Sequence, residues 1–183
     1  MIGAGGLLLG ILASSLLTGV VIFFLKEEEH RLRTGLNLAG AGLKIVLVAD
    51  LLQRVAEEEV LEWRWNVLPG LDLALGADSN SVLFVTLSAV LWLFTTVYAV
   101  GYLEHAPHRS RFFGFFSLCV SATTGIALSA NMFTLLVFYE LLTVTTYPLV
   151  VHRGTPDALR GGRTYLVYTL VGGAALLSAV AWL

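Results

Sequence analysis

Six long apolar runs constrain this chain more than any other feature of its sequence. A helix needs about 20 mostly apolar residues to cross roughly 30 Å of hydrocarbon, and each run approaches that length. The runs cover residues 2–25, 36–52, 82–103, 112–128, 132–151 and 165–183. Lipid offers no hydrogen-bond partner to a peptide group, so the runs should be helices, and short alternating strands typical of a barrel are absent. The sequence therefore predicts an all-α membrane protein with about six transmembrane helices.

The composition supports this fold class and excludes several functions. Of the 183 residues, 57% are hydrophobic and 13% are charged, against about 25% charged in an ordinary soluble domain. The net charge is −2 and the 11 Lys and Arg are scattered, which predicts no nucleic-acid partner. Cys119 is the single cysteine, and no glycine-rich nucleotide-binding motif is present, so we expect no disulfide, metal or cofactor.

The segment between the second and third runs has a different pattern. Residues 60–67 and 71–75 alternate in polarity, and a Pro-Gly pair at 69–70 separates them. This pattern predicts a small β-hairpin outside the membrane. An alternative for Trp63 and Trp65 is that their rings rest at the level of the lipid headgroups.

The distribution of Lys and Arg predicts the orientation in the membrane, because cytoplasmic loops carry an excess of both. Eight lie after the first, third and fifth runs, whereas only Arg54 and Arg64 lie on the other side. The eight are Lys26, Arg31, Arg33, Arg109, Arg111, Arg153, Arg160 and Arg163. We therefore expect a multi-pass protein of the inner (plasma) membrane, with the N-terminus and the hairpin extracytoplasmic.

Glu140 is the candidate for proton translocation. It lies near the middle of the fifth run, where a carboxylate costs roughly 2.5 kcal/mol or more and should face a protein interior or water. Thr143 and Tyr147 follow at i+3 and i+7, on the same helix face. A buried carboxylate whose cationic partner approaches and withdraws can release and take up a proton. The alternative is a structural glutamate that hydrogen-bonds a neighbouring helix.

Lys44 and His152 are weaker candidates for the same path. Lys44 lies nine residues into the second run, near mid-membrane, and could pair with Glu140, although its long stem could also reach the surface. His152 ends the fifth run beside Arg153. Such a pair is typical of cytoplasmic anchoring, but the histidine could also pass protons on.

The stretch 131–152, with Glu140 and the ending Tyr-Pro-Leu-Val-Val-His, resembles the fifth helix of the antiporter-like membrane subunits. This family comprises the proton-pumping subunits of respiratory complex I and of membrane-bound hydrogenases, and subunits of Mrp-type cation/proton antiporters. The resemblance covers nearly the whole chain, and the Gly-Gly-Arg-Thr-Tyr-Leu stretch at 161–166 is more similar to the Mrp D-type and hydrogenase branch.

The resemblance implies that Glu140 is the helix 5 glutamate of the proton path, whose usual partner is a lysine on helix 7. Residues 1–183 would then be one transmembrane domain, the N-terminal part of a 14-helix subunit that works with other membrane subunits. The function expected is proton conduction in a cation (sodium)/proton antiporter. The alternatives are a proton-pumping subunit of an NADH-quinone oxidoreductase or hydrogenase, and a scaffold in which Glu140 only joins helices.

Overall fold

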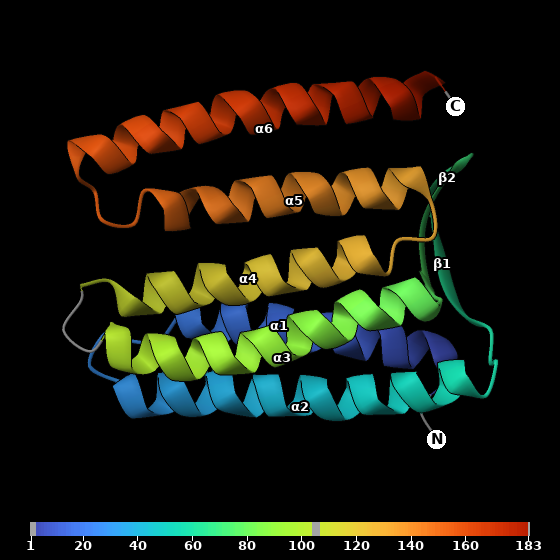
Figure 1. Ribbon diagram of the computed structural model, residues 1–183, viewed down its shortest axis with the longest axis horizontal. Coiled ribbons are helices and arrows are strands. Elements are labelled where there is room, and N and C mark those ends of the chain that lie inside the picture. Colours follow the sequence, from blue (N-terminus) through green and yellow to red (C-terminus); the bar gives the residue numbers. More distant parts are fainter. Residues whose placement is uncertain (1–2, 104–106, 183) are drawn as a thin grey trace.

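Residues 3–103 and 107–182 are described by a computed structural model, and they form six helices and one hairpin (Figure 1). The elements are α1 (Ala4–Phe23), α2 (His30–Ala56), β1 (Leu61–Leu68), β2 (Leu71–Ala77), α3 (Ser79–Tyr102), α4 (Arg109–Ala127), α5 (Met132–Val150) and α6 (Pro156–Trp182). Ile2 and Leu183, the expected outer ends of the first and last helices, lie outside the described residues. The expected all-α membrane fold with a small hairpin is confirmed.

Two helices begin earlier than their apolar runs. The structure starts α2 at His30 instead of 36, and α6 at Pro156 instead of 165. The start of α6 has local causes: Pro156 suits a first helical position, and the Thr155 hydroxyl accepts a hydrogen bond from the Ala158 amide. Hydropathy marks the apolar part of a helix, so polar first turns were wrongly expected to be loops.

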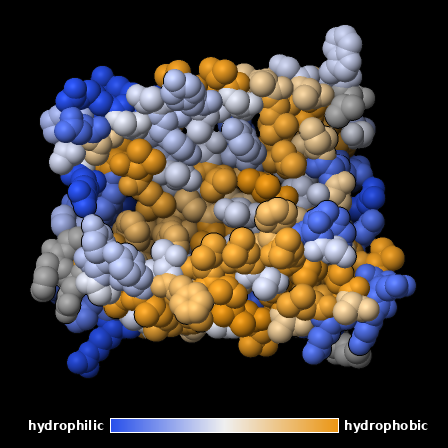
Figure 2. Space-filling model, in the orientation of Figure 1, coloured by the Kyte–Doolittle hydropathy of each residue, from blue (hydrophilic) through white to orange (hydrophobic). Residues whose placement is uncertain are grey.

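The number of membrane crossings remains a prediction. Five of the helices in the described residues, all except α4, are long and apolar enough to cross a bilayer. Helix α4 lies alongside them (Figure 1) and packs on α1, α3 and α5. Its Ser and Thr side chains are largely buried inside the bundle, which explains its lower apolar content. Figure 2 shows apolar side chains over the middle of one face and hydrophilic residues toward its two ends.

The two ends of the bundle differ in what they carry (Figure 1). The α1–α2 and α5–α6 loops and the first turn of α4 lie together at one end, which we call the Arg-rich end. The hairpin and the α4–α5 connection lie at the other, the hairpin end. The basic residues thus gather as the sequence predicts, while the side of the membrane that each end faces remains a prediction.

The hairpin closes one end of the bundle and fixes the start of α5. Its strands are antiparallel, and Gly70 adopts a positive φ of 87° in the turn. The Ala74 amide donates to the Thr134 hydroxyl at 2.8 Å, and the Ala130 amide donates to the Ala74 carbonyl at 2.9 Å. Trp63 packs on Gly5 of α1, whereas Trp65 is 58% exposed. The headgroup interpretation therefore remains open only for Trp65.

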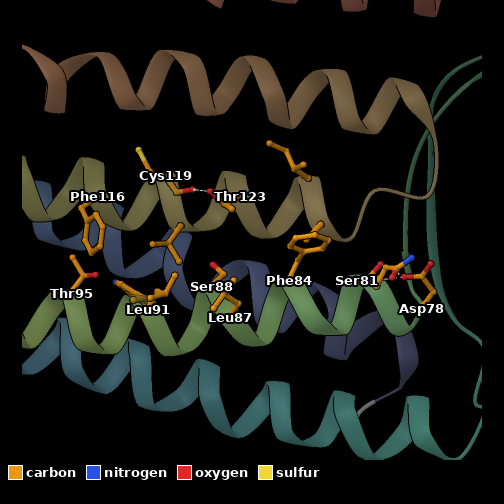
Figure 3. A pocket seen from close by; sticks show the side chains of 15 residues that line it. Asp78, Ser81, Phe84, Leu87, Ser88, Leu91, Thr95, Phe116, Cys119 and Thr123 are labelled. Atoms are coloured by element: carbon orange, nitrogen blue, oxygen red, sulfur yellow. Dashed lines mark hydrogen bonds between the residues drawn. The ribbon is translucent and has the colours of Figure 1, made fainter. Parts of the chain in front are cut away.

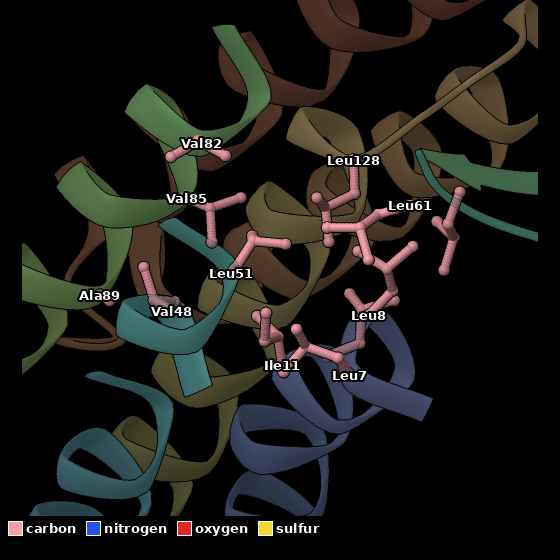
Figure 4. Close-up of a cluster of buried hydrophobic side chains, with 12 residues drawn as sticks. Leu7, Leu8, Ile11, Val48, Leu51, Leu61, Val82, Val85, Ala89 and Leu128 are labelled. Carbon is pink, nitrogen blue, oxygen red and sulfur yellow. The ribbon is translucent and has the colours of Figure 1, made fainter. Parts of the chain in front are cut away.

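An apolar core lies beneath the hairpin (Figure 4). It joins four helices and β1 through the side chains of Leu7, Leu8, Ile11, Val48, Leu51, Leu61, Val82, Val85, Ala89 and Leu128. Branched and γ-branched side chains from different helices fill this volume, so this end of the bundle interior is dry.

Gly125 permits the close contact between α4 and α5, because a Cβ at this position would collide with the Phe138 ring. Gly125→Leu should lower the free energy of unfolding by about 1–3 kcal/mol through overpacking. Gly42→Leu is the matched control, since no atom lies within 4 Å of a Cβ built at Gly42. Denaturant titration in detergent micelles measures both, and equal losses would contradict the proposed contact.

Candidate functional site

Glu140 lies half-buried in the middle of α5 and faces α6. Its carboxylate lies against Gly173, where a Cβ would collide with Oε1. Within the described residues, no hydrogen bond or ion pair holds this carboxylate. An unpaired carboxylate at this depth is unfavourable in lipid, so the α5–α6 contact is a chemically unusual place.

Thr143 and Tyr147 lie on the same interface as Glu140. Thr143 is buried, and its backbone carbonyl accepts a hydrogen bond of 3.5 Å from the Tyr165 hydroxyl of α6. The Tyr147 ring lies 3.1 Å from the position of a Cβ on Gly162. The three side chains therefore form one polar stripe against α6, and Gly162 and Gly173 give them space.

Lys44 is fully buried between α1, α2, α3 and α4. Its Nζ donates hydrogen bonds to Thr124 Oγ1 at 2.5 Å and Ser15 Oγ at 3.2 Å. The ammonium also lies 5.6 Å from the centroid of the Trp92 ring, at a distance suited to a cation–π contact. The side chain does not reach the surface, and the described residues place no carboxylate in an ion pair with it.

Lys44 and Glu140 lie on opposite flanks of α4 rather than in contact. On the α4–α5 interface, Gly125 packs against Phe138, and the Cys119 thiol donates to the Thr145 hydroxyl at 3.5 Å. In this antiparallel register, Glu140 is level with Thr123 and Thr124. The two ionisable groups thus lie at the same depth, separated by one helix.

His152 follows α5 at the Arg-rich end. Its ring packs edge-to-face on Phe112 with centroids 5.4 Å apart. Partial burial lowers the pKa of the imidazole below its usual 6.5, and the positive charges of Arg111 and His108 add to this, while Glu27 opposes it. His152 is therefore neutral over a wider pH range than a solvated histidine, and it lies far along α5 from Glu140.

A cavity of about 700 Å³ lies between α3 and α4 (Figure 3). Its walls are mostly apolar, with Phe84 and Leu91 on one side and Phe116 on the other. Trp92, which contacts Lys44, also lines it. Asp78 at one end caps α3 by accepting from the Ser81 amide at 2.7 Å, and hydrogen bonds from Ser81 lower its pKa. This cavity therefore carries a structural carboxylate and no group placed for proton relay.

Sequence reasoning missed a second group of buried polar residues. Arg33 was expected in a loop, but it lies in α2, 2% exposed, and donates to Ser110 Oγ at 2.8 Å. The Ser117 hydroxyl donates to Asn37 Oδ1 at 3.1 Å. The signal in the sequence was the spacing of seven residues between Ser110, Ser117 and Thr124, which places three hydroxyls on one face of α4.

Comparisons with known proteins support the resemblance found in the sequence, although no family model matches the chain. The D-type Na(+)/H(+) antiporter protein of Bacillus subtilis is 26% identical over 171 residues, which are 92% of this chain and 34% of that protein. The NADH-quinone oxidoreductase subunit L of Mycobacterium tuberculosis is 30% identical over 155 residues, which are 80% and 24%. The chain thus spans about a third or less of the length of these relatives.

Among solved structures, a chain of the Mrp complex from Dietzia superposes with a TM-score of 0.82 at 21% identity. The match covers 99% of this chain and 34% of that one. At this identity the match shows a shared fold.

The Lys44–Thr124 hydrogen bond should stabilise the bundle. Thr124→Val removes one acceptor of a buried ammonium, so the free energy of unfolding should fall by about 1–3 kcal/mol. Thr123→Val is the matched control, because this neighbouring hydroxyl is exposed and donates only to the Cys119 carbonyl. Chemical unfolding in micelles measures both, and a loss at Thr123 as large as at Thr124 would refute the assigned role.

The pKa of His152 predicts a pH dependence of stability. Because the folded-state pKa lies below 6.5, the unfolded chain binds more protons between the two values. The contribution of His152 is therefore complete above pH 6.5 and is lost as the pH falls through the folded-state pKa. NMR titration should give a midpoint below 6.5, which Arg111→Ala raises. Arg160→Ala, at an exposed ion pair with Asp157, should leave the midpoint unchanged.

Proposed function

We propose that this chain, a homologue of the antiporter-like membrane subunits, conducts protons within a multisubunit cation (sodium)/proton antiporter. The observation that carries the proposal is the unpaired, half-buried carboxylate of Glu140 against Gly173, near the middle of a helix that can cross the bilayer. The relationship to the D-type Na(+)/H(+) antiporter protein of Bacillus subtilis supports the choice of transport class.

Glu140 would act as the proton carrier. A cation that approaches the carboxylate favours its charged form and releases the proton, and withdrawal of the cation lets the carboxylate reload. Within the described residues, no cationic side chain pairs with Glu140. The moving cation would therefore come from another part of the assembled complex, since this chain spans 34% of the length of the Bacillus subtilis relative.

The other predicted residues have supporting roles in this proposal. Thr143 and Tyr147 would give the polar stripe along which water reaches Glu140, and His152 would exchange protons at the Arg-rich end. The basic residues at that end support a cytoplasmic location for it, in the plasma membrane, with the N-terminus and the hairpin outside. A continuation of the chain toward 14 helices remains a prediction.

A second candidate function is proton pumping in a redox complex, in which partner chains carry out quinone or hydrogenase chemistry. The relationship to NADH-quinone oxidoreductase subunit L of Mycobacterium tuberculosis favours it. Purification of the native complex separates the two functions, because iron-sulfur or flavin proteins would accompany the chain only in a redox complex. In either case this chain would contribute the proton path and no redox centre.

The experiment that tests the proposal is proton and sodium exchange in everted vesicles that carry the assembled complex. Glu140→Gln removes the titratable group with little change in volume, so exchange should fall at least about tenfold while assembly is retained. Glu58→Gln, at an exposed position near the hairpin, is the matched control and should exchange normally. Normal exchange by an assembled Glu140→Gln complex would leave Glu140 a structural residue and this chain a scaffold.

A further inference from the structure

Three hydrogen bonds join α2 to α4 inside the bundle, and together they form what we call the polar ladder. Its rungs are Arg33–Ser110, Asn37–Ser117 and Lys44–Thr124. All six residues are at most 5% exposed. Positions 33, 37 and 44 share one face of α2, and positions 110, 117 and 124 share one face of α4. The ladder therefore leads from the Arg-rich end to the middle of the bundle.

The outer end of the ladder opens at the Arg-rich surface. A cavity of about 200 Å³ lies there, and Arg33, Thr34 and Val100 are among the residues that line it. The Glu27 carboxylate, about half exposed, accepts a hydrogen bond from the Ser110 amide at 3.1 Å and lies 3.9 Å from Arg33 Nη1. An exposed carboxylate thus lies directly beside the first rung and can exchange protons with bulk water.

Two polar atoms beside the ladder have no partner. Thr96 Oγ1 and Trp92 Nε1, on α3, are buried and make no hydrogen bond. Trp92 packs against Gly40, and Val100 lines the outer cavity together with Arg33, so Thr96 is level with the middle rung. A buried polar group without a partner costs about 1–3 kcal/mol, and ordered water is the usual remedy. Both atoms lie where water between the rungs would be bound.

The ladder ends at Lys44 because the interior beyond it is apolar. One turn further along α2, Val48 belongs to the dry core shown in Figure 4, and Val85 and Ala89 cover it from α3. No buried polar side chain of α2 lies in that direction. A path for water would therefore reach Lys44 from the Arg-rich end alone, and would stop at the depth of Glu140, on the other flank of α4.

We propose that the polar ladder lines a hydrated half-channel, which runs from Glu27 and Arg33 to Lys44 and exchanges protons between Lys44 and the Arg-rich surface. The half-channel rests on the proposed function, for which it supplies a route on the α2 side of α4, separate from the stripe at Glu140. Water bound by Thr96 Oγ1 and Trp92 Nε1 bridges the rungs. Lys44 is the terminal ionisable group, and Thr124 joins it to the helix that separates it from Glu140.

The hydration is tested by silver-ion accessibility in the full chain within its native complex. In a Cys119→Ala background, Thr96→Cys places a thiol of nearly the same size beside the middle rung. Ala89→Cys is the matched control, seven residues away on the same face of α3 but inside the dry core. Ag⁺ follows water and avoids lipid, and thiols that it has not reacted with are alkylated after unfolding in SDS. Thr96→Cys should react at least about tenfold faster, because the control thiol is exposed only by local unfolding.

The role of Lys44 is tested in the same vesicles by exchange with Lys44→Met, which should fall at least about tenfold in an assembled complex. Equal Ag⁺ rates at positions 96 and 89 would overturn the half-channel even where Glu140→Gln abolishes exchange. Rapid reaction at position 96 with normal exchange by Lys44→Met would overturn proton exchange through Lys44. Rapid reaction at 96 with normal exchange by Glu140→Gln would leave the hydrated path standing and remove the proposed function of Glu140.

Discussion

A charged group removed from water must find partners inside the protein, and the burial of Lys44 organises much of this bundle. The ammonium has hydroxyl acceptors on α1 and α4 and the face of Trp92 on α3. Since these partners belong to different helices, the three contacts fix both the rotation of α2 and its position along its neighbours. Loss of that register would leave the ammonium without partners in an apolar interior, which is strongly unfavourable.

The polar character of α4 follows from the same constraint. Its Ser and Thr side chains serve as partners for α2 and α1, as when the Ser121 hydroxyl donates to the Leu12 carbonyl at 3.1 Å. Small residues also let the backbones approach: a Cβ on Gly19 of α1 would lie 2.9 Å from the Gly114 carbonyl oxygen. A helix of this kind is better suited to the interior of a bundle than to lipid. Helix α6, by contrast, buries only Gly162 and Gly173 among its described residues.

Two ionisable groups thus occupy one depth of the bundle with different surroundings. Lys44 is enclosed and has hydrogen-bond partners, whereas Glu140 lies at the α5–α6 contact and has none within the described residues. A group that is fully satisfied holds a structure together, and a group that is left unsatisfied is available to an incoming charge. The proposed transport function depends on this difference, because proton transfer requires a carboxylate whose environment can change.

Local patterns in the sequence were enough to predict several features. Apolar runs predicted the helices, alternation around Pro69 and Gly70 predicted the hairpin, and the position of Glu140 within its run predicted its depth. Helix propensity, turn chemistry and hydropathy act over a few residues, so these features can be read without the fold. The family resemblance, carried by residues 131–152, is also confirmed by homologues.

Only the tertiary structure decided which side chains meet. The sequence allowed Lys44 to pair with Glu140 or to reach the surface, yet the helix register gives it Ser15 and Thr124 instead. Arg33 was expected in a loop but is buried beside Ser110, because α2 begins before its apolar run. Partners in a helical bundle depend on the rotation and offset of whole helices, which are set by contacts between residues far apart in the chain, such as the 80 positions between Lys44 and Thr124.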